Sequence, residues 1–254
     1  ANISQGRNLA ISQATGEVIA STDGGVRLDP GWLKHLVRAL GDEDVDVASG
    51  FFVGEPSSAF ESALGATTLP DLSDIDPEKF LPSSRSVAFR RRSWSSVGGY
   101  PEWLDYSEDL AFDLRLQEAG YRFKFVPEAM VRFPPRSSLS AFFHQYYLYA
   151  RGDGKADLWR VRHTVRYGSY LLLAPALLLL GGAIAPLFWG LLLILGLTHL
   201  WAPFRRLIPR LSELGPFGRV EAILWVPIIR LTGDLAKMLG YPLGVWWRWR
   251  NRPR

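Results

Sequence analysis

The chain has 254 residues, of which 48% are hydrophobic and 13% aromatic, and its net charge at pH 7 is +4. This composition excludes a disordered chain, and the lack of Cys excludes disulfides and thiolate metal sites. The basic residues cluster beside apolar stretches, as they do at a cytoplasmic membrane face, so we expect a membrane lipid as partner and no nucleic acid. The chain opens with Ala and shows no signal pattern, so we expect it to begin within a domain.

The first 150 residues alternate helical and strand patterns, which indicates an α/β fold. Asp29 and Pro30 predict an N-cap and a first helical position for the run WLKHLVRAL. Ser107 and Gly120 predict the start and the end of a second helix, and Pro127 predicts the end of the strand YRFKFVP. The remaining predicted elements, in chain order, are the helix NISQGRNLAISQA, the strands GEVIAST and VDVASGFFVG, the loop DLSDIDPEKFLPSS, the strand SVAFR and the helix SLSAFFHQYYLYARG.

A long uncharged stretch follows this part of the chain. No Asp, Glu, Lys or Arg occurs from Tyr167 to Phe204, and this stretch is nearly twice the ~20 residues that one spanning helix needs. Gly and Pro residues at its middle favour a break, so we predict a membrane hairpin at about 167–203. Arginines flank it on both sides, which predicts that both of its ends are cytoplasmic. These arginines are Arg160, Arg162, Arg166, Arg205, Arg206 and Arg210.

The last apolar segment carries Arg230, Asp234 and Lys237. Each charge near a bilayer centre costs roughly 2.5–3.5 kcal/mol, although spacings of three and four residues allow one helical face to hold all three. The segment at about 220–247 is therefore an amphipathic or a third membrane helix. The arginine-rich end WWRWRNRPR favours a helix on the cytoplasmic leaflet, because spanning would export those charges.

Three motifs in order carry a resemblance: GRNLAISQATGEVIASTDGGVRLDPGWLKHLVRAL, then SVAFRRRSWSSVGGYPEWLDYSEDLAFDLRLQEAGYRFKFVPEAMVRF, then QYYLYARGDGKA. They resemble the later part of a family 2 glycosyltransferase with the GT-A (Rossmann-like) fold, which is inverting. The resemblance implies a partial GT-A catalytic domain at 1–156 followed by an α-helical membrane region at 157–254. The family's earlier half, which holds the nucleotide base, has no counterpart here.

The acid pair Glu108 and Asp109 lies at the first turn of a predicted helix, where the macrodipole favours ionised carboxylates. Sugar transfer from a nucleotide diphosphate needs a base for the acceptor hydroxyl and stabilisation of the leaving diphosphate. The resemblance implies Asp109 as the catalytic base and Glu108 as a catalytic residue that positions it. The alternative is that both acids only cap the helix.

The resemblance also implies which residues bind the nucleotide-sugar donor: Asp23, Arg7, Asn8, Gly25 and Arg132. In the family, an acid two residues after Asp23 holds Mg²⁺ or Mn²⁺, often with a His, but this chain has Gly25 and no His in VRFPPR. Asp23 is the only candidate metal ligand and makes a weak site alone, so metal use is doubtful. Either arginines, with Arg132 foremost, neutralise the diphosphate, or the preceding half supplies other ligands.

Four residues are candidates for acceptor binding. Trp103 and Tyr106 come just before the base, where an aromatic face suits a sugar ring, although core packing explains them nearly as well. Gln145 and Arg151 resemble the Gln-x-x-Arg-Trp motif of processive relatives, but the Arg comes six residues after the Gln and no Trp follows. This departure puts a processive polymer synthase in doubt.

The sequence therefore predicts an enzyme, a hexosyltransferase-like inverting glycosyltransferase. It transfers a sugar from a nucleotide-sugar donor to a lipid-linked or cell-envelope polysaccharide acceptor. We expect a multi-pass protein of the inner membrane with a cytoplasmic catalytic domain. The alternative is a catalytically silent membrane scaffold that keeps the fold, an interpretation motivated by Gly25 and the missing first half.

Overall fold

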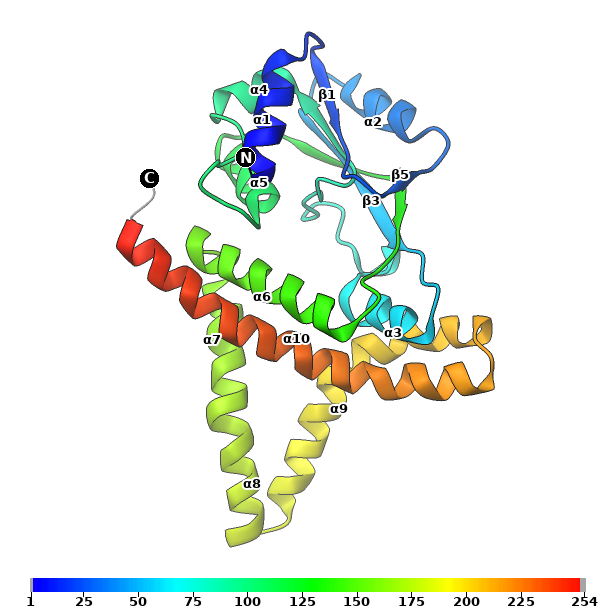
Figure 1. The fold of residues 1–254 in the computed structure, drawn as a ribbon, viewed down its shortest axis with the longest axis vertical. Coiled ribbons are helices and arrows are strands. Elements are labelled where there is room, and N and C mark those ends of the chain that lie inside the picture. The colour runs from blue at the N-terminus through cyan, green and yellow to red at the C-terminus, as the bar shows by residue number, and fades with distance from the viewer. Residues whose placement is uncertain (1, 252–254) are drawn as a thin grey trace. The chain divides into compact units, whose positions relative to one another are not determined.

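The computed structural model describes residues 2–251, so residue 1 and residues 252–254 of the predicted arginine-rich tail lie outside it. The described chain forms two compact units (Figure 1). The α/β unit contains the residues up to Glu55 together with Pro70–Pro134. The helical unit contains Pro56–Leu69 and the residues from Pro135 onward. The predicted division between 1–156 and 157–254 by function stays a prediction.

The α/β unit is built on one five-stranded sheet with the strand order β1-β4-β3-β5-β2. The strands β3 and β5 are parallel, whereas the other neighbours are antiparallel. This mixed sheet, followed by helices, confirms the predicted fold class. The strand bounds are Val18–Ser21 for β1, Arg27–Leu28 for β2, Val47–Gly54 for β3, Val87–Arg90 for β4 and Phe123–Phe133 for β5.

Helices cover both faces of this sheet, because successive side chains of a strand point to opposite faces. Ala48 and Ala88 face α2 (Trp32–Leu40), whose Leu36 is fully buried against them. Val47 and Phe89 contribute to a second core on the other face. That core includes residues of α1 (Ile3–Gln13), α4 (Arg91–Ser96) and α5 (Glu108–Glu118). In Figure 1, α1, α4 and α5 lie on one side of the sheet and α2 lies on the other.

Two local predictions for this unit were wrong. The strand β5 does not end at Pro127. Its pairing with β3 jumps from Val126 to Met130, so Pro127, which has no backbone N–H, lies in the unpaired part of the strand. Asp29 does not cap α2, which begins at Trp32 after Gly31 in the left-handed region. The predicted start of α5 was correct in position, because Ser107 is its N-cap residue, although Ser107 has a φ of 64° and its side chain makes no capping hydrogen bond in the described chain.

The helical unit contains a hairpin, three further helices and a core between them. Its helices are α3 (Ala59–Thr68), α6 (Leu139–Ala156), α7 (Arg160–Tyr167), a π-helical turn (Gly168–Leu173), α8 (Ala174–Ala183), α9 (Leu187–Leu207) and α10 (Pro216–Asn251). The sequence motifs did not predict α3, which begins at the cap Ser58. Its Phe60 and Leu64 share a buried cluster with Phe142 of α6 and Ile229 of α10. Short 3-10 turns lie at Leu72–Asp74 of the α/β unit, within the predicted loop, and at Ile208–Glu213 of the helical unit.

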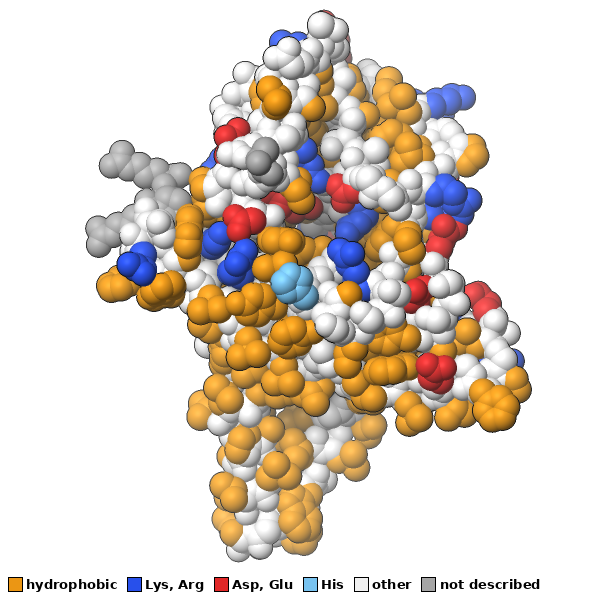
Figure 2. Space-filling view, in the orientation of Figure 1, with side chains coloured by type: hydrophobic (Ala, Val, Ile, Leu, Met, Phe, Trp, Pro, Cys, Tyr) orange, Lys and Arg blue, Asp and Glu red, His pale blue; other side chains and the backbone are white. Residues whose placement is uncertain are grey.

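Two segments of this unit are long and apolar enough to cross a membrane, judged by length and composition. They are Arg160–Ala183 and Leu187–Glu213, and only 11% and 6% of their most apolar windows are buried. The break lies at residues 184–186, between α8 and α9, in the middle of the uncharged stretch as predicted. Figure 2 shows hydrophobic side chains over the surface of this hairpin. Two exposed apolar helices give the predicted membrane association modest support.

Candidate active site

Asp23 and Arg85 face each other at one edge of the sheet. The antiparallel pairing of β1 with β4 sets Val18 opposite Arg90 and Ser21 opposite Val87. Continued two residues past Ser21, the same register brings Asp23 opposite Arg85. Thr22 Oγ1 donates a hydrogen bond to the Arg85 carbonyl at 2.9 Å, which holds the two segments together. The Arg85 Nε atom lies 4.0 Å from Asp23 Oδ2.

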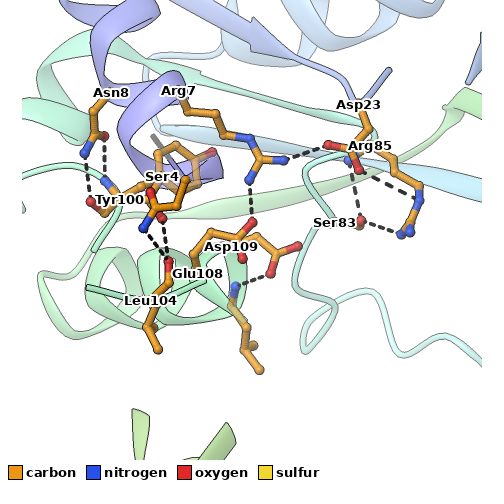
Figure 3. A network of polar contacts seen from close by, with 12 residues as sticks. Ser4, Arg7, Asn8, Asp23, Ser83, Arg85, Tyr100, Leu104, Glu108 and Asp109 are labelled. Atoms are coloured by element: carbon orange, nitrogen blue, oxygen red, sulfur yellow. Dashed lines mark hydrogen bonds and ion pairs between the residues drawn. The ribbon is translucent and has the colours of Figure 1, made fainter. Parts of the chain in front are cut away.

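Arg7 of α1 joins Asp23 to the start of α5 (Figure 3). Its guanidinium donates to Asp23 Oδ1 at 2.7 Å and to Glu108 Oε1 at 2.7 Å. The Arg7 side chain is 16% exposed, and its guanidinium lies 5.4 Å from the centre of the Tyr100 ring. Charge-assisted bonds of this length are the stronger class of protein hydrogen bond. One largely buried arginine therefore fixes the loop that carries Asp23 against the helix that carries the predicted base.

The first turn of α5 carries two carboxylates in different surroundings. Glu108 is buried, and burial together with the charge of Asp109 raises its pKa, which the paired Arg7 partly offsets. Asp109 is half-buried, and its Oδ1 accepts a hydrogen bond from the Leu110 N–H at 2.8 Å. Asp113 follows one turn later, fully inside, and burial and the charge of Asp109 raise its pKa well above the ordinary range. Asp109 is thus the most exposed carboxylate of this group.

Arg85 was missed by the sequence interpretation, which nominated Arg132. The Arg85 Nη1 atom donates to Ser83 Oγ at 3.1 Å, and the Arg85 guanidinium lies over the Phe133 ring, 4.6 Å from the centre. In SSRSVAF, Arg85 stands two residues before β4, and antiparallel pairing with β1 places it opposite Asp23, two residues after β1. Finding it required the strand register, which the sequence does not state.

The structure sets Arg132 in a different contact. Its guanidinium donates to both carboxylate oxygens of Asp29, at 2.8 and 3.1 Å. This hydrogen bond lowers the pKa of Asp29. Arg132 and Phe133 are consecutive in β5 and leave the strand on opposite faces, so Arg132 points away from the ring that supports Arg85. Its predicted role toward the donor remains a prediction.

The other predicted donor residues contribute to the backbone framework. Asn8 donates to the Tyr100 carbonyl at 2.8 Å, and its Oδ1 accepts from the Tyr100 N–H at 2.9 Å. It therefore orders the loop that leads to α5. Gly25 has a φ of 79°, a conformation that side chains disfavour, and forms the turn after Asp23.

The predicted acceptor residues lie in two places. Trp103 and Tyr106 are half-buried in the loop before α5. Gln145 and Arg151 belong to α6 in the helical unit. There Gln145 accepts from Arg136 at 3.2 Å and donates to the Tyr149 hydroxyl at 2.6 Å.

The residues around Asp23 do not by themselves fit a Mg²⁺ or Mn²⁺ site. Gly25 brings no side-chain oxygen, and Asp23 Oδ1 already accepts a hydrogen bond from Arg7. Within residues 2–251, no group of three or more His, Cys, Asp or Glu side chains could hold a metal ion. Hard divalent cations take six or more oxygen ligands, so these residues alone leave most of the shell to other donors.

A protein-family model, described as glycosyl transferase family group 2, matches residues 23–209. The match covers most of the chain and includes Asp23, Arg85 and the acids of α5. The chain belongs to this family, and the predicted family is confirmed.

Relatives with known names agree with this assignment. The chain is 28% identical over 182 residues to the pre-mycofactocin glycosyltransferase of Mycobacterium tuberculosis (strains CDC 1551 / Oshkosh and ATCC 25618 / H37Rv). That alignment covers 68% of this chain and 38% of the relative. It is also 29% identical over 77 residues to the O-antigen chain rhamnosyltransferase WbaN of Salmonella anatum, over 29% of this chain and 24% of the relative. The chain thus spans well under half of these relatives.

Solved structures also show similarity. One is the mannosyltransferase PcManGT from Pyrobaculum calidifontis in complex with GDP-Man and Mn²⁺, with 17% identity and a TM-score of 0.46 over 100% of this chain and 68% of that one. Another is GalNAc-T7 with UDP, GalNAc and Mn²⁺, with 15% identity and a TM-score of 0.40 over 61% of this chain and 34% of that one.

Proposed function

We propose that the protein transfers a sugar from a nucleotide-sugar donor to an acceptor hydroxyl with inversion. The observation that carries the proposal is the network in which Arg7 joins Asp23 to Glu108, beside Asp109. Family membership supports the activity. This group combines an accessible carboxylate with arginines near the place expected for the diphosphate.

In the proposed reaction, Asp109 accepts the proton of the acceptor hydroxyl as that oxygen attacks the anomeric carbon. The bond from this carbon to the diphosphate oxygen breaks on the opposite face, so the configuration inverts. The leaving diphosphate takes the electron pair of the broken bond. Glu108, held by Arg7, fixes the first turn of α5 and thereby positions Asp109.

The test is Asp109→Asn in the full-length protein, assayed with a panel of nucleotide sugars. We expect kcat to fall 10²- to 10⁴-fold while donor affinity changes little, because the amide keeps the shape and loses the proton acceptor. Glu118→Gln, at the exposed end of the same helix, is the matched control and should keep wild-type turnover. An Asp109→Asn variant with more than half of wild-type turnover would remove the assignment.

A catalytically silent scaffold is the second candidate, favoured by Gly25 and by the engagement of Asp23 with Arg7. It predicts that the wild-type full-length protein binds donors weakly or not at all and turns none of them over. Turnover of a single donor that depends on Asp109 excludes it.

We propose further that arginines carry the charge role that a metal has in related enzymes. Among the described residues, Arg85 is the second arginine that pairs with Asp23, after Arg7, and an arginine fork can bind a phosphate bidentately. Transfer should persist in excess EDTA and fall steeply in Arg85→Gln, with Arg132→Ala as the comparison. Activity that disappears with EDTA and returns with Mn²⁺ would show that a metal is required.

We also propose that the protein sits in the membrane with its α/β unit at the cytoplasmic face and uses a lipid-linked or cell-envelope acceptor. The apolar hairpin and its arginine flanks support this location. The proposed membrane is the inner one, and the hairpin crosses it twice. Membrane fractionation of the full-length protein, with carbonate extraction, tests the location, and full release into the soluble fraction would contradict it.

A further inference from the structure

Helix α10 has two opposite faces. It spans 36 residues, which corresponds to about 54 Å at 1.5 Å per residue. One face is buried, and its residues recur at three- and four-residue spacing. They include Val226, Ile229, Gly233, Ala236, Gly240 and Gly244.

This buried face packs against α6 at backbone distance. A Cβ at Gly240 would collide with the carbonyl oxygen of Tyr147, and a Cβ at Gly244 would collide with that of Arg151. Glycine at both positions therefore lets the two helices touch through their main chains. This main-chain contact fixes the position of α6 relative to α10.

The opposite face of α10 is a continuous exposed apolar stripe, which we call the α10 stripe. Its members also recur every three or four residues, so they lie on one side of the helix. Its members are Leu224, Ile228, Leu231, Leu235, Leu239 and Leu243, each between 44% and 61% exposed. A contiguous exposed apolar face of this length indicates a binding surface.

The charges in the middle of α10 lie off this stripe, whereas the exposed Glu221 lies at its beginning, three residues before Leu224. Asp234 is buried and accepts a hydrogen bond from Arg166 of α7 at 2.8 Å, with His199 of α9 at 3.0 Å from its other oxygen. Lys237 lies over the Tyr146 ring of α6, 4.8 Å from its centre. The charges that complicate a spanning helix thus point to neighbouring helices and leave the stripe apolar.

The length of α10 and the side chains near its end indicate that a membrane covers the α10 stripe. A helix of about 54 Å is much longer than the roughly 30 Å hydrocarbon core of a bilayer. Near its end, Trp246 and Trp249 are exposed and the Arg250 guanidinium lies over the Trp246 ring, a pairing typical of a membrane–water interface. In Figure 1, α10 runs across the open end of the hairpin formed by α8 and α9.

We infer that α10 lies in the plane of the membrane, with the α10 stripe buried at the boundary between lipid headgroups and acyl chains. The inference rests on the proposed membrane location of the hairpin. It distinguishes between the two possibilities for the segment at about 220–247, because an in-plane helix keeps its whole stripe at one depth.

One consequence concerns the acceptor. Because α6 packs through glycine on the face of α10 opposite the α10 stripe, the inference places α6 beside α10 on the aqueous side. Gln145 and Arg151, the predicted acceptor residues, lie on α6. This placement is compatible with the lipid-linked acceptor proposed above.

The test is depth measurement by spin labelling in the full-length protein, reconstituted in vesicles of phosphatidylethanolamine and phosphatidylglycerol. The chain has no Cys, so each introduced Cys is unique within it. Nitroxides are attached at Leu224→Cys, Leu235→Cys and Leu243→Cys, and collision with oxygen is compared with collision with a water-soluble nickel complex. Leu193→Cys in α9 serves as the membrane reference and Glu78→Cys as the aqueous reference, because both side chains are exposed.

We expect the three stripe labels to report one shallow depth of about 5–10 Å and the Leu193 label to report a deeper position. Stripe depths that pass through the bilayer from one label to the next would show a spanning helix and overturn the inference. Stripe labels as accessible to nickel as Glu78, or shielded from both reagents, would also overturn it, the latter indicating a protein partner. A Leu193 label in water would instead refute the proposed membrane location itself.

Discussion

Arg7 offers the sharpest test of the candidate site, because it makes two short ion pairs at once. Arg7→Met keeps most of the side-chain volume and removes the guanidinium that joins Asp23 to Glu108. The Glu108 side chain is 9% exposed, whereas that of Asp23 is 33% exposed. Water can therefore replace the lost partner at Asp23 but not at Glu108.

The exposures set the expected magnitude. A hydrogen bond to a charged group contributes about 1.5–3 kcal/mol, and removing one partner of a buried ion pair costs about 3–5 kcal/mol. The contribution from Asp23 is small because solvent screens exposed pairs. We therefore expect Arg7→Met to lower the free energy of unfolding by about 3 kcal/mol, mostly through Glu108.

The pH dependence of this loss separates charge from packing. Without Arg7, the pKa of Glu108, already raised by burial and Asp109, rises further above its unfolded value. A group with a raised folded pKa contributes stability below its unfolded pKa and loses it as the pH rises through the folded pKa. Urea unfolding of wild type and Arg7→Met should thus show a smaller difference at pH 5 than at pH 8.

A matched control and a refuting result complete this test. Arg27 pairs with Glu55, but these side chains are 66% and 39% exposed, so Arg27→Met should cost less than about 1 kcal/mol. Equal losses in the two variants would refute the reasoning. A loss in Arg7→Met that does not change between pH 5 and pH 8 would show that Arg7 acts by packing on the Tyr100 ring.

Three further predictions concern buried groups and topology. Compared with the wild type, Asp113→Asn should be more stable at pH 8 than it is at pH 4, because burial raises the Asp113 pKa and the wild type loses stability as the pH rises through that pKa. Urea unfolding of both proteins at both pH values checks this, and a difference that is the same at pH 4 and pH 8 contradicts it. Gly50→Ala should cost about 1–3 kcal/mol, because its Cβ would collide with Ser86, whereas Gly6→Ala has open space and should not destabilise. Asn251→Cys should resist impermeant thiol reagents in intact cells, and labelling from outside would show that α10 spans.

Parts of the site could be predicted from sequence because they are local. Asp23 follows a short strand and the acid pair opens a helix, and both features follow from residues that are neighbours along the chain. The hairpin also follows from a local property, since an uncharged run of this length has one main explanation. The family could likewise be predicted, because its motifs are contiguous.

The errors have a different origin, because each involves partners distant in sequence. Asp29 looked like a helix cap until β5 brought Arg132 to it, 103 positions away. Pro127 looked like a strand end, but a shift in the pairing with β3 allows the strand to continue past it. Local propensity lost in both cases to tertiary contacts that the local pattern does not contain.

The sequence alone therefore determined the family, the α/β class, the apolar hairpin and the acid pair, because each depends on composition or on spacing within a few residues. Only the tertiary structure decided that Arg85 stands opposite Asp23, that Arg7 joins Asp23 to Glu108, and which face of α10 is exposed. These depend on strand register and on helix packing, which join residues far apart in the chain, and many registers and packings are compatible with the same local pattern.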